Sequence, residues 1–152
     1  MPRRKKEEQP KEEVKVIKTP SLAIGMKDVL PTEEIFWNSV IDTAAHFAEV
    51  YSFGRLRMPI LENTKLFVRS VGKDTDIVDK EMYTFEDRGG DSITLRPEGT
   101  ASVVRAYIEH KMYKPPSVLK MFYIGPMFRY ERPQAGRLRQ FNQIGVEAMG
   151  SP

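Results

Sequence analysis

The sequence predicts an α+β fold, in which an antiparallel sheet is flanked by helices. Two apolar segments near the carboxyl end, 122–128 and 141–149, are joined by a polar loop and have the pattern of a long hairpin. A shorter hairpin precedes them, and the segments with helical periodicity are collected around the hairpins instead of alternating with single strands. This order of elements is typical of α+β proteins and differs from that of doubly wound α/β proteins.

Length and composition restrict the class of protein. The chain has 152 residues, 40% of them hydrophobic and 30% charged, which fits one globular domain. It contains no apolar run long enough to span a membrane, and no apolar segment follows the basic amino terminus as in a secretory signal. The absence of cysteine excludes disulfides and fits a reducing compartment, so we expect a cytoplasmic protein. The net charge of +3 permits a nucleotide or nucleic-acid partner without requiring one.

The first part of the chain divides into a tail and a helix. Residues 1–20 are mostly charged and lack apolar periodicity, so we expect a mobile tail there. Helical periodicity then runs from Ile35 to Tyr51, after the acidic Glu33 and Glu34. An apolar face as wide as this predicts contacts on two sides: with the sheet, and with another layer or a second subunit. Its two stripes contain Phe36, Val40, Ala44, Phe47 and Tyr51 in one, and Trp37, Ile41, Ala45 and Ala48 in the other.

The middle of the chain predicts shorter elements. Residues 55–61 alternate as in a strand, which Pro59 restricts to a sheet edge because proline cannot donate to a ladder. The remaining predicted elements are a helix from Asn63–Thr64 to Val71, a charged loop over 73–80, a hairpin of 82–85 with 92–95 that turns at Gly89–Gly90, a helix over 101–113 capped by Thr100 and ended by Pro115–Pro116, and a strand from Val118.

The loop of the long hairpin and its flanks carry most of the chemistry visible in the residues themselves. Four arginines lie close together at Arg129, Arg132, Arg137 and Arg139. Guanidinium groups bind phosphate and carboxylate bidentately, so these residues indicate an anionic ligand. A solvated hairpin whose charges only maintain solubility is the alternative. The sequence contains neither of two common phosphate-binding loops, Gly-x-x-x-x-Gly-Lys-Ser/Thr and Gly-x-Gly-x-x-Gly. A nucleotide would therefore have to be bound by arginines on strands.

Three stretches together resemble the amino-terminal part of the histidyl-tRNA synthetases, a family of class II aminoacyl-tRNA synthetases. The predicted long helix followed by RLRMPILE resembles motif 1, with Pro59 at the motif's proline. TLRPEGT, from Thr94 to Thr100, resembles the family's histidine-binding loop. YIGPMFRYERPQAGRLRQFNQIGVE resembles motif 2, with the Phe-Arg-x-Glu core at residues 128–131. The resemblance extends from about Ile24 to Gly150, so residues 21–152 are interpreted as the amino-terminal part of a class II catalytic domain.

The resemblance implies a fold and an activity. The fold is a class II synthetase-like catalytic core, here incomplete, because motif 3, the second histidine-specific arginine segment and the anticodon-binding domain are absent from the sequence. The activity is that of a histidine–tRNA ligase, which activates histidine with ATP and transfers it to tRNA(His). The resemblance further implies that magnesium bridges the phosphates of ATP and that a homodimer forms through the region 35–61. We expect the 152 residues alone to be inactive.

The resemblance also assigns roles to individual residues. Arg129 matches the motif 2 arginine and is the candidate catalytic residue at the α-phosphate. The other candidates for ATP are Glu131 at the adenine amino group, Phe141 stacking on the ring, and Arg137 at the terminal phosphates or the tRNA acceptor end. The candidates for histidine are Glu98, Thr100 and Gln143 at its amino group and Glu147 at its imidazole. No residue is assigned as a metal ligand.

Some of these residues have simpler interpretations. Glu98 alone would be a carboxylate that stabilises a helix start, and Gln143 and Glu147 alone would be outward-facing strand positions. The spacing of four places Gln143 and Glu147 on one sheet face with Phe141 and Gly145. Arg139 shares that face and is a candidate salt-bridge partner. Asn142 replaces the family's usual histidine, and we expect it on the opposite face with little effect on the substrate.

Two other function classes remain open at this point. One is a synthetase-like regulatory subunit of histidine biosynthesis. Such paralogues tend to lose the ATP and tRNA residues, whereas Arg129, Glu131, Arg137 and Phe141 are all present. The other is a non-catalytic dimerisation fragment that uses the wide face of the 35–51 helix and the strand around Pro59.

Overall fold

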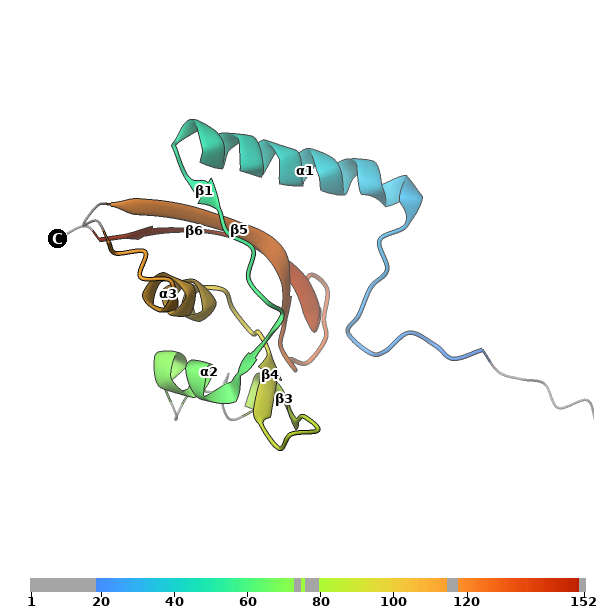
Figure 1. Ribbon diagram of the computed structural model, residues 1–152. Coiled ribbons are helices and arrows are strands. Elements are labelled where there is room, and N and C mark those ends of the chain that lie inside the picture. Colours follow the sequence, from blue (N-terminus) through green and yellow to red (C-terminus); the bar gives the residue numbers. More distant parts are fainter. Residues whose placement is uncertain (1–18, 73–74, 76–79, 115–117, 151–152) are drawn as a thin grey trace, which may run out of the picture.

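The computed structural model describes residues 19–72, 75, 80–114 and 118–150 (Figure 1). Nearly all of the predicted tail, most of the predicted charged loop over 73–80, and Pro115–Pro116 lie outside these residues. The helices are α1 (Pro31–Val50), α2 (Thr64–Val71) and α3 (Thr100–Glu109). The strands are β1 (Gly54–Arg55), β2 (Leu61–Asn63), β3 (Tyr83–Glu86), β4 (Ser92–Leu95), β5 (Leu119–Phe128) and β6 (Gln140–Met149). None of the described helices is long and apolar enough to cross a membrane.

The α+β prediction is confirmed, with one difference in the sheet. The strands form two three-stranded sheets, in the orders β1-β5-β6 and β2-β4-β3. The second sheet is antiparallel throughout, whereas β1 pairs with β5 in parallel. The sheet of β1, β5 and β6 lies between α1 and α3, and the sheet of β2, β4 and β3 lies beside α2 (Figure 1). Flanking helices were predicted, and the first of these sheets has a helix on each face.

The long hairpin is formed by β5 and β6, which pair over their full length from Leu119↔Met149 to Phe128↔Gln140. Along β6, half-buried residues alternate with exposed ones. Since neighbouring side chains on a strand point to opposite faces, the half-buried Phe141, Gln143 and Glu147 share one face, as predicted. That face lies toward α3, where Val103 and the β5 residues Met121, Tyr123 and Met127 form a buried core.

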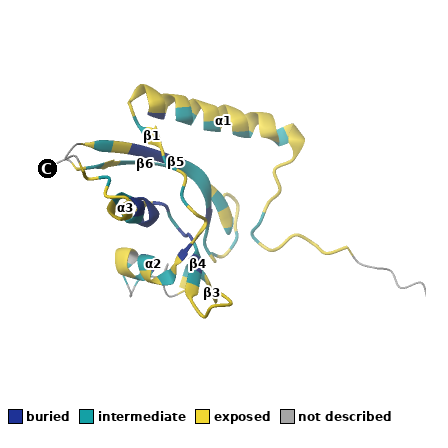
Figure 2. Ribbon diagram, in the orientation of Figure 1, coloured by how far each residue is buried: buried dark blue, intermediate teal, exposed yellow. Residues whose placement is uncertain are grey.

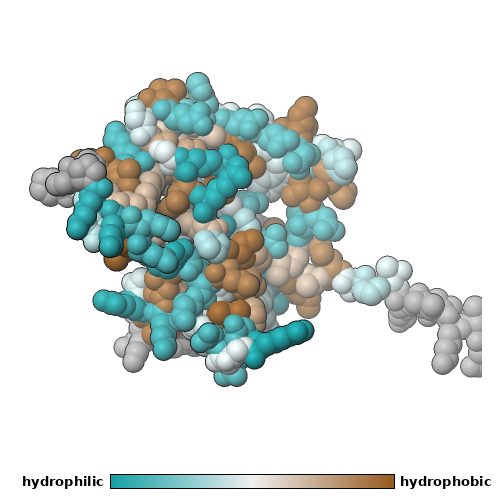
Figure 3. All heavy atoms as spheres, viewed as in Figure 1, coloured by the Kyte–Doolittle hydropathy of each residue, from teal (hydrophilic) through white to brown (hydrophobic). Residues whose placement is uncertain are grey.

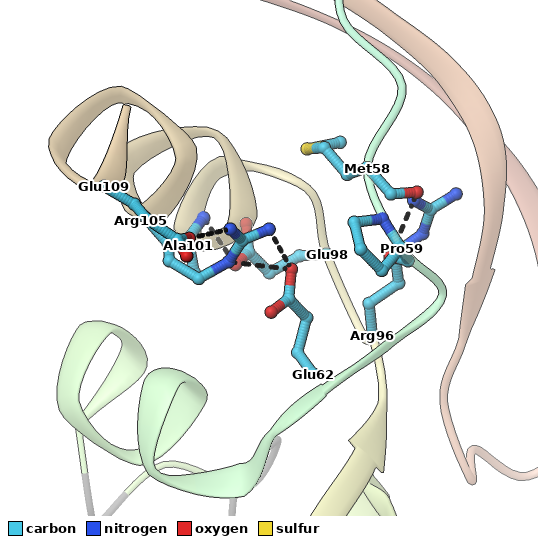
Figure 4. Close-up of polar contacts among 8 residues, drawn as sticks. All are labelled: Met58, Pro59, Glu62, Arg96, Glu98, Ala101, Arg105 and Glu109. Atoms are coloured by element: carbon cyan, nitrogen blue, oxygen red, sulfur yellow. Dashed lines mark hydrogen bonds and ion pairs between the residues drawn. The ribbon is translucent and has the colours of Figure 1, made fainter. Parts of the chain in front are cut away.

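The strand predicted for residues 55–61 is divided into two short strands. β1 ends at Arg55 and β2 begins at Leu61, and each pairs with a different sheet. Between them, the carbonyl oxygens of Met58 and Pro59 accept hydrogen bonds from the Arg96 guanidinium, at 2.9 and 3.2 Å, instead of from a neighbouring strand (Figure 4). Pro59 has no N–H, which further prevents a continuous ladder.

The prediction that Thr100 caps its helix is wrong. The residue at the cap position of α3 is Gly99, and the carboxylate of Glu98 supplies the side-chain hydrogen bonds. One of its oxygens accepts from the Thr100 N–H at 2.6 Å and the other from the Ala101 N–H at 2.9 Å. The helix also ends at Glu109, before the predicted Tyr113, because Lys111 adopts a left-handed backbone with φ of 53°. The Thr100 hydroxyl is thereby left for a different contact.

Helix α1 presents its two apolar stripes differently. Trp37, Ile41, Ala45 and Ala48 are half-buried or buried, whereas Phe36, Val40, Phe47 and Tyr51 are exposed (Figure 2). Phe36 is 72% exposed and Phe47 58% exposed. Hydrophobic side chains also gather over both ends of this helix in the space-filling view (Figure 3). One side of the wide face therefore packs onto the protein, and the other is uncovered.

A buried ion pair connects β2 to α3. Arg105 donates to a single oxygen of Glu62, from Nε at 3.1 Å and from Nη2 at 2.7 Å, and donates to Glu109 at 2.7 Å (Figure 4). The two carboxylates differ in burial, because the Glu62 side chain is 7% exposed and that of Glu109 is 60% exposed. The hydrogen bonds with Glu62 are the main reason that the pKa of Arg105 is raised. They outweigh its partial desolvation.

This difference in burial gives a matched pair of substitutions. We expect Glu62→Gln to lower the free energy of unfolding by about 1–2 kcal/mol, because it leaves a guanidinium facing a neutral partner at a buried site. Glu109→Gln should lower it by less than about 0.5 kcal/mol, because an exposed i,i+4 pair contributes little. Urea unfolding followed by circular dichroism measures both values. Equal losses in the two variants would contradict the interpretation.

Candidate functional site

A pocket of about 580 Å³ lies where the loop joins β5 to β6. The structure brings together here the four residues predicted to bind ATP. The lining consists of Glu81, Arg129, Glu131, Gly136, Arg137, Leu138, Phe141 and Asn142. Asn142 is exposed, and although its strand position alternates away from Phe141, it borders this pocket.

Arg129 is held in place by three neighbours. Its Nε donates to the carbonyl oxygen of Pro97 at 2.9 Å, and its guanidinium lies 5.2 Å from the centre of the Phe141 ring. Its Nη1 is 3.8 Å from a Glu131 oxygen, which is an ion pair without a direct hydrogen bond. Among the described hydrogen bonds, the guanidinium of Arg129 thus uses only Nε. Both terminal nitrogens remain able to donate to the oxygens of an anion.

Glu131 lies between two guanidinium groups. Besides its contact with Arg129, its second oxygen is 3.6 Å from Nη1 of Arg137, whose side chain is 66% exposed. Charge-assisted hydrogen bonds between such groups are normally about 2.7–2.9 Å long, so both ion pairs are loose. An entering anion can therefore replace the carboxylate beside each arginine without breaking a short hydrogen bond.

Arg139 does not act as the predicted salt-bridge partner. Within the described residues it forms no ion pair, and its guanidinium instead stacks 3.8 Å from the centre of the Tyr130 ring. Its Nε donates to the Glu131 carbonyl oxygen at 3.1 Å, and its backbone N–H donates to Gly25 at 2.7 Å. Arg139 therefore stabilises the loop around the pocket and connects it to the segment before α1.

The four residues predicted to bind histidine gather around one buried phenol, that of Tyr123. Thr100 donates from its hydroxyl to Glu147 at 2.7 Å, and Gln143 donates from Nε2 to the Tyr123 oxygen at 3.3 Å. Burial raises the pKa of Tyr123, and a side-chain hydrogen bond with Thr100 opposes this. The nearby carboxylates of Glu147 and Glu98 raise it further. The cluster is thus rich in acceptor groups.

Glu98 has the helix-start role that its position alone suggests, since both of its oxygens accept from the first turn of α3. Each carboxylate oxygen has a second lone-pair direction, so these bonds fix the carboxylate without exhausting it. Glu98 and Thr100 also border an apolar pocket of about 1130 Å³ between α2 and α3. Its other lining residues include Leu66, Val104 and Ile108.

Tyr123 is a site residue that the sequence analysis did not identify. It is 3% exposed, and its ring fills a slot between Gly99 and Gly145. A Cβ atom on Gly99 would lie 2.3 Å from the ring, and one on Gly145 would lie 2.2 Å from it. Tyr123 is the cross-strand partner of Gly145. The available sequence signal for this role was an aromatic residue paired with a glycine on the neighbouring strand. That signal can be recognised only once the register of the hairpin is known.

One acceptor in this cluster has no partner among the described residues. The Oε1 atom of Gln143 is buried, and no described group donates a hydrogen bond to it. A buried acceptor left unpaired costs about 1–3 kcal/mol, which a ligand with an ammonium or N–H group would recover. The arrangement of Glu98, Gln143 and Glu147 therefore suits a ligand with several N–H donors.

The two clusters lie side by side in the structure. Arg129 in the first cluster bonds to Pro97, and Pro97 directly precedes Glu98 in the second. Phe141 lies on the same face of β6 as Gln143 and Glu147. An arginine-rich cluster and an acceptor-rich cluster adjoin on an antiparallel hairpin with flanking helices, which is the arrangement that the resemblance to the amino-terminal part of a class II aminoacyl-tRNA synthetase core implies.

The comparisons with known proteins identify the particular family. A family model described as histidyl-tRNA synthetase matches residues 25–152. The chain therefore belongs to the histidyl-tRNA synthetase family. It is 61% identical over 127 residues to a histidine–tRNA ligase of Halothermothrix orenii and 58% identical over 127 residues to one of Natranaerobius thermophilus. Each match covers 84% of this chain and 30% of the relative, so the chain spans about 30% of the length of these relatives.

Solved structures agree with the fold. The structure of apo histidyl-tRNA synthetase from S. aureus matches with a TM-score of 0.69 and 43% identity, over 84% of this chain and 28% of that one. A structure from Bacillus halodurans, described as an ATP phosphoribosyltransferase regulatory subunit/histidyl-tRNA synthetase, matches with a TM-score of 0.71 over 90% of this chain and 34% of that one. At 22% identity, the second match shows the fold alone.

Proposed function

We propose that this chain supplies the amino-terminal part of a histidine–tRNA ligase, which activates histidine with ATP and transfers it to tRNA(His). The observation that carries the proposal is the pairing of two adjoining clusters. Arg129, Glu131, Arg137 and Phe141 line one pocket, and Glu98, Thr100, Gln143 and Glu147 surround Tyr123 beside it. The names of the curated relatives support the same activity.

In the first step, a carboxylate oxygen of histidine forms a bond to the α-phosphorus of ATP, and the bond to pyrophosphate breaks. Negative charge increases on the phosphoryl oxygens in the transition state. Arg129 is proposed to stabilise that charge, because Pro97 and Phe141 fix its guanidinium before the substrate arrives. Phe141 then offers its ring to adenine, Glu131 accepts from the adenine amino group, and Arg137 reaches the terminal phosphates or the tRNA acceptor end.

Histidine is proposed to bind through the second cluster. Its ammonium group donates to Glu98, Thr100 and Gln143, and its imidazole faces Glu147. The unpaired Oε1 of Gln143 supports this arrangement, because a wrong amino acid that leaves buried acceptors unpaired is rejected strongly.

Magnesium is proposed to bridge the phosphates of ATP, where it would neutralise part of their charge. In the part of the chain that the structure describes, no group of three or more acidic, histidine or cysteine residues could hold a metal ion. The proposal therefore places the ion on ATP oxygens and assigns it no ligand from the described residues.

A homodimer in the cytoplasm is the proposed state of the protein. The uncovered stripe of α1 supports the dimer, because Phe36, Val40, Phe47 and Tyr51 form an exposed apolar surface within the region that resembles motif 1. Exposed apolar residues of β6, Ile144 at 44% and Val146 at 56%, add to the uncovered surface.

The proposed function is tested with a hybrid ligase. This protein joins residues 21–150 to the part of the H. orenii relative that follows its matching segment, which is feasible at 61% identity. We expect the hybrid ligase to catalyse histidine-dependent exchange of pyrophosphate into ATP, and the 152 residues alone to be inactive. A folded hybrid without this exchange would contradict the proposed function. Histidine binding without exchange would instead favour the regulatory-subunit alternative.

A further inference from the structure

Two side-chain hydrogen bonds organise the histidine cluster. The Thr100 hydroxyl donates to Glu147 at 2.7 Å, and the Gln143 amide nitrogen donates to the phenol oxygen of Tyr123 at 3.3 Å. Toward Gln143 the phenol is therefore the acceptor.

The bond to the phenol orients the side-chain amide of Gln143. An amide nitrogen can only donate, so the end of the amide that faces Tyr123 is Nε2, at 3.3 Å from the phenol oxygen. With its Nε2 bound to the phenol, the amide must direct Oε1 away from it, and this is the buried oxygen that has no partner among the described residues.

The phenol cannot easily change its position. Its ring is 3% exposed and is enclosed by Gly99 and Gly145, at positions where a Cβ atom would overlap the ring. The slot thereby fixes the phenol oxygen relative to β6. A rigid neighbour of this kind can maintain one orientation of an amide, whereas a mobile hydroxyl or a water molecule would accept either.

We propose that Tyr123 is a positioning residue that holds Gln143 as a hydrogen-bond acceptor, and that it thereby selects ligands with an ammonium group over analogues that lack it. The proposal rests on the proposed function of the cluster as the histidine site. It assigns Tyr123 no contact with the ligand. Its effect passes through the orientation of the Gln143 amide.

The first test measures ligand selection in the hybrid ligase with Tyr123→Phe, which keeps the ring in its slot and removes only the hydroxyl. The probes are histidine as substrate and imidazolepropionate, which lacks the amino group, as a competitive inhibitor. We expect the preference for histidine over imidazolepropionate to fall about tenfold, with the KM for ATP unchanged. A merely structural role would weaken both ligands equally, and an unchanged preference would overturn the proposal.

Tyr107→Phe provides a matched control. Tyr107 is also partly buried and packs against the same core, and its described contact is with the ring of Tyr113 and involves no hydrogen bond of its hydroxyl. We expect this variant to keep the preference of the hybrid ligase. A tenfold loss in the control as well would show that the selection does not depend on the Tyr123 hydroxyl, and would overturn the proposal.

The second test requires no ligand binding and uses the 152-residue chain. In its NMR spectrum, the side-chain amide protons of Gln143 should show nuclear Overhauser effects to the Tyr123 ring, and their shifts should change in Tyr123→Phe. Absence of these effects in a folded chain would overturn the positioning role. Failure of the proposed function would look different, since an inactive hybrid ligase would leave the amide signals in place.

Discussion

Replacing Arg96 by methionine is expected to lower the free energy of unfolding by about 3–5 kcal/mol. Arg96 is 4% exposed, and its guanidinium donates to three carbonyl oxygens, from Nη1 to Met58 and Pro59 and from Nε to Pro126 at 2.9 Å. Methionine fills a similar volume but has no donor. The three carbonyl oxygens would then lose the donor that the buried side chain supplies, and a carbonyl oxygen left unpaired away from water costs about 1–3 kcal/mol.

The position of Arg96 explains why the effect should be global. Its three acceptors lie in the link between β1 and β2 and in β5, so the guanidinium connects the two sheets (Figure 4). Burial lowers the pKa of Arg96, and the carboxylate of Glu62 opposes this shift. The site also requires a glycine on β5, because a Cβ atom on Gly125 would lie 2.5 Å from Nη2 of Arg96.

Urea unfolding of Arg96→Met, followed by circular dichroism, measures this loss. Arg88→Met is the control, because Arg88 is exposed in the turn of the short hairpin and should change the free energy of unfolding by less than about 0.5 kcal/mol. Arg96→Lys should fall between the two, since it keeps the charge but cannot reach three carbonyl oxygens at once. A loss below about 1 kcal/mol in Arg96→Met would contradict the connecting role.

Features that depend on local patterns were predictable from the sequence. The two stripes of α1 follow from helical periodicity, and the hairpin of β5 and β6 follows from alternation around a polar loop. Asn63 caps α2, as its residue type suggests, by accepting from the Lys65 N–H at 3.0 Å. In each case the residues that determine the structure are neighbours in the chain.

Features that depend on distant residues were not predictable. The predicted strand over 55–61 is interrupted because the Met58 carbonyl oxygen accepts from Arg96, which lies 38 positions later in the chain. The role of Tyr123 depends on Gly99 and Gly145, which only the fold brings against its ring. The cap of α3 was misassigned because Glu98 and Thr100 both have suitable oxygens, and the Thr100 hydroxyl bonds to Glu147 on another element.

The candidate site was predictable in part. The resemblance to motif 2 indicated Arg129, Glu131, Arg137 and Phe141, and the structure places all four around one pocket. The resemblance did not indicate the hydrogen bond from Arg129 to Pro97, which connects the predicted ATP residues to the loop that carries Glu98. Because that bond joins two segments 32 positions apart, only the folded chain reveals it.

Replacing Arg129 by lysine is expected to lower kcat for pyrophosphate exchange in the hybrid ligase about 100- to 1,000-fold, because one preorganised donor at a transition-state charge contributes an effect of this size. Lysine has a single nitrogen, and it cannot donate to the Pro97 carbonyl oxygen while binding phosphoryl oxygens in the fixed geometry of a guanidinium. It also loses the planar contact with Phe141. Because lysine keeps the positive charge, the loss in kcat measures what the geometry of the guanidinium contributes.

Arg132→Lys is the matched control for this prediction. Arg132 is an exposed arginine of the same loop and does not line the pocket, so we expect its variant to retain exchange within about twofold. The KM for ATP separates two explanations of a loss in Arg129→Lys. If kcat falls while the KM for ATP changes little, Arg129 acts mainly on the transition state. If the KM alone rises, its role is limited to binding ATP, and the proposed catalytic role of Arg129 is wrong.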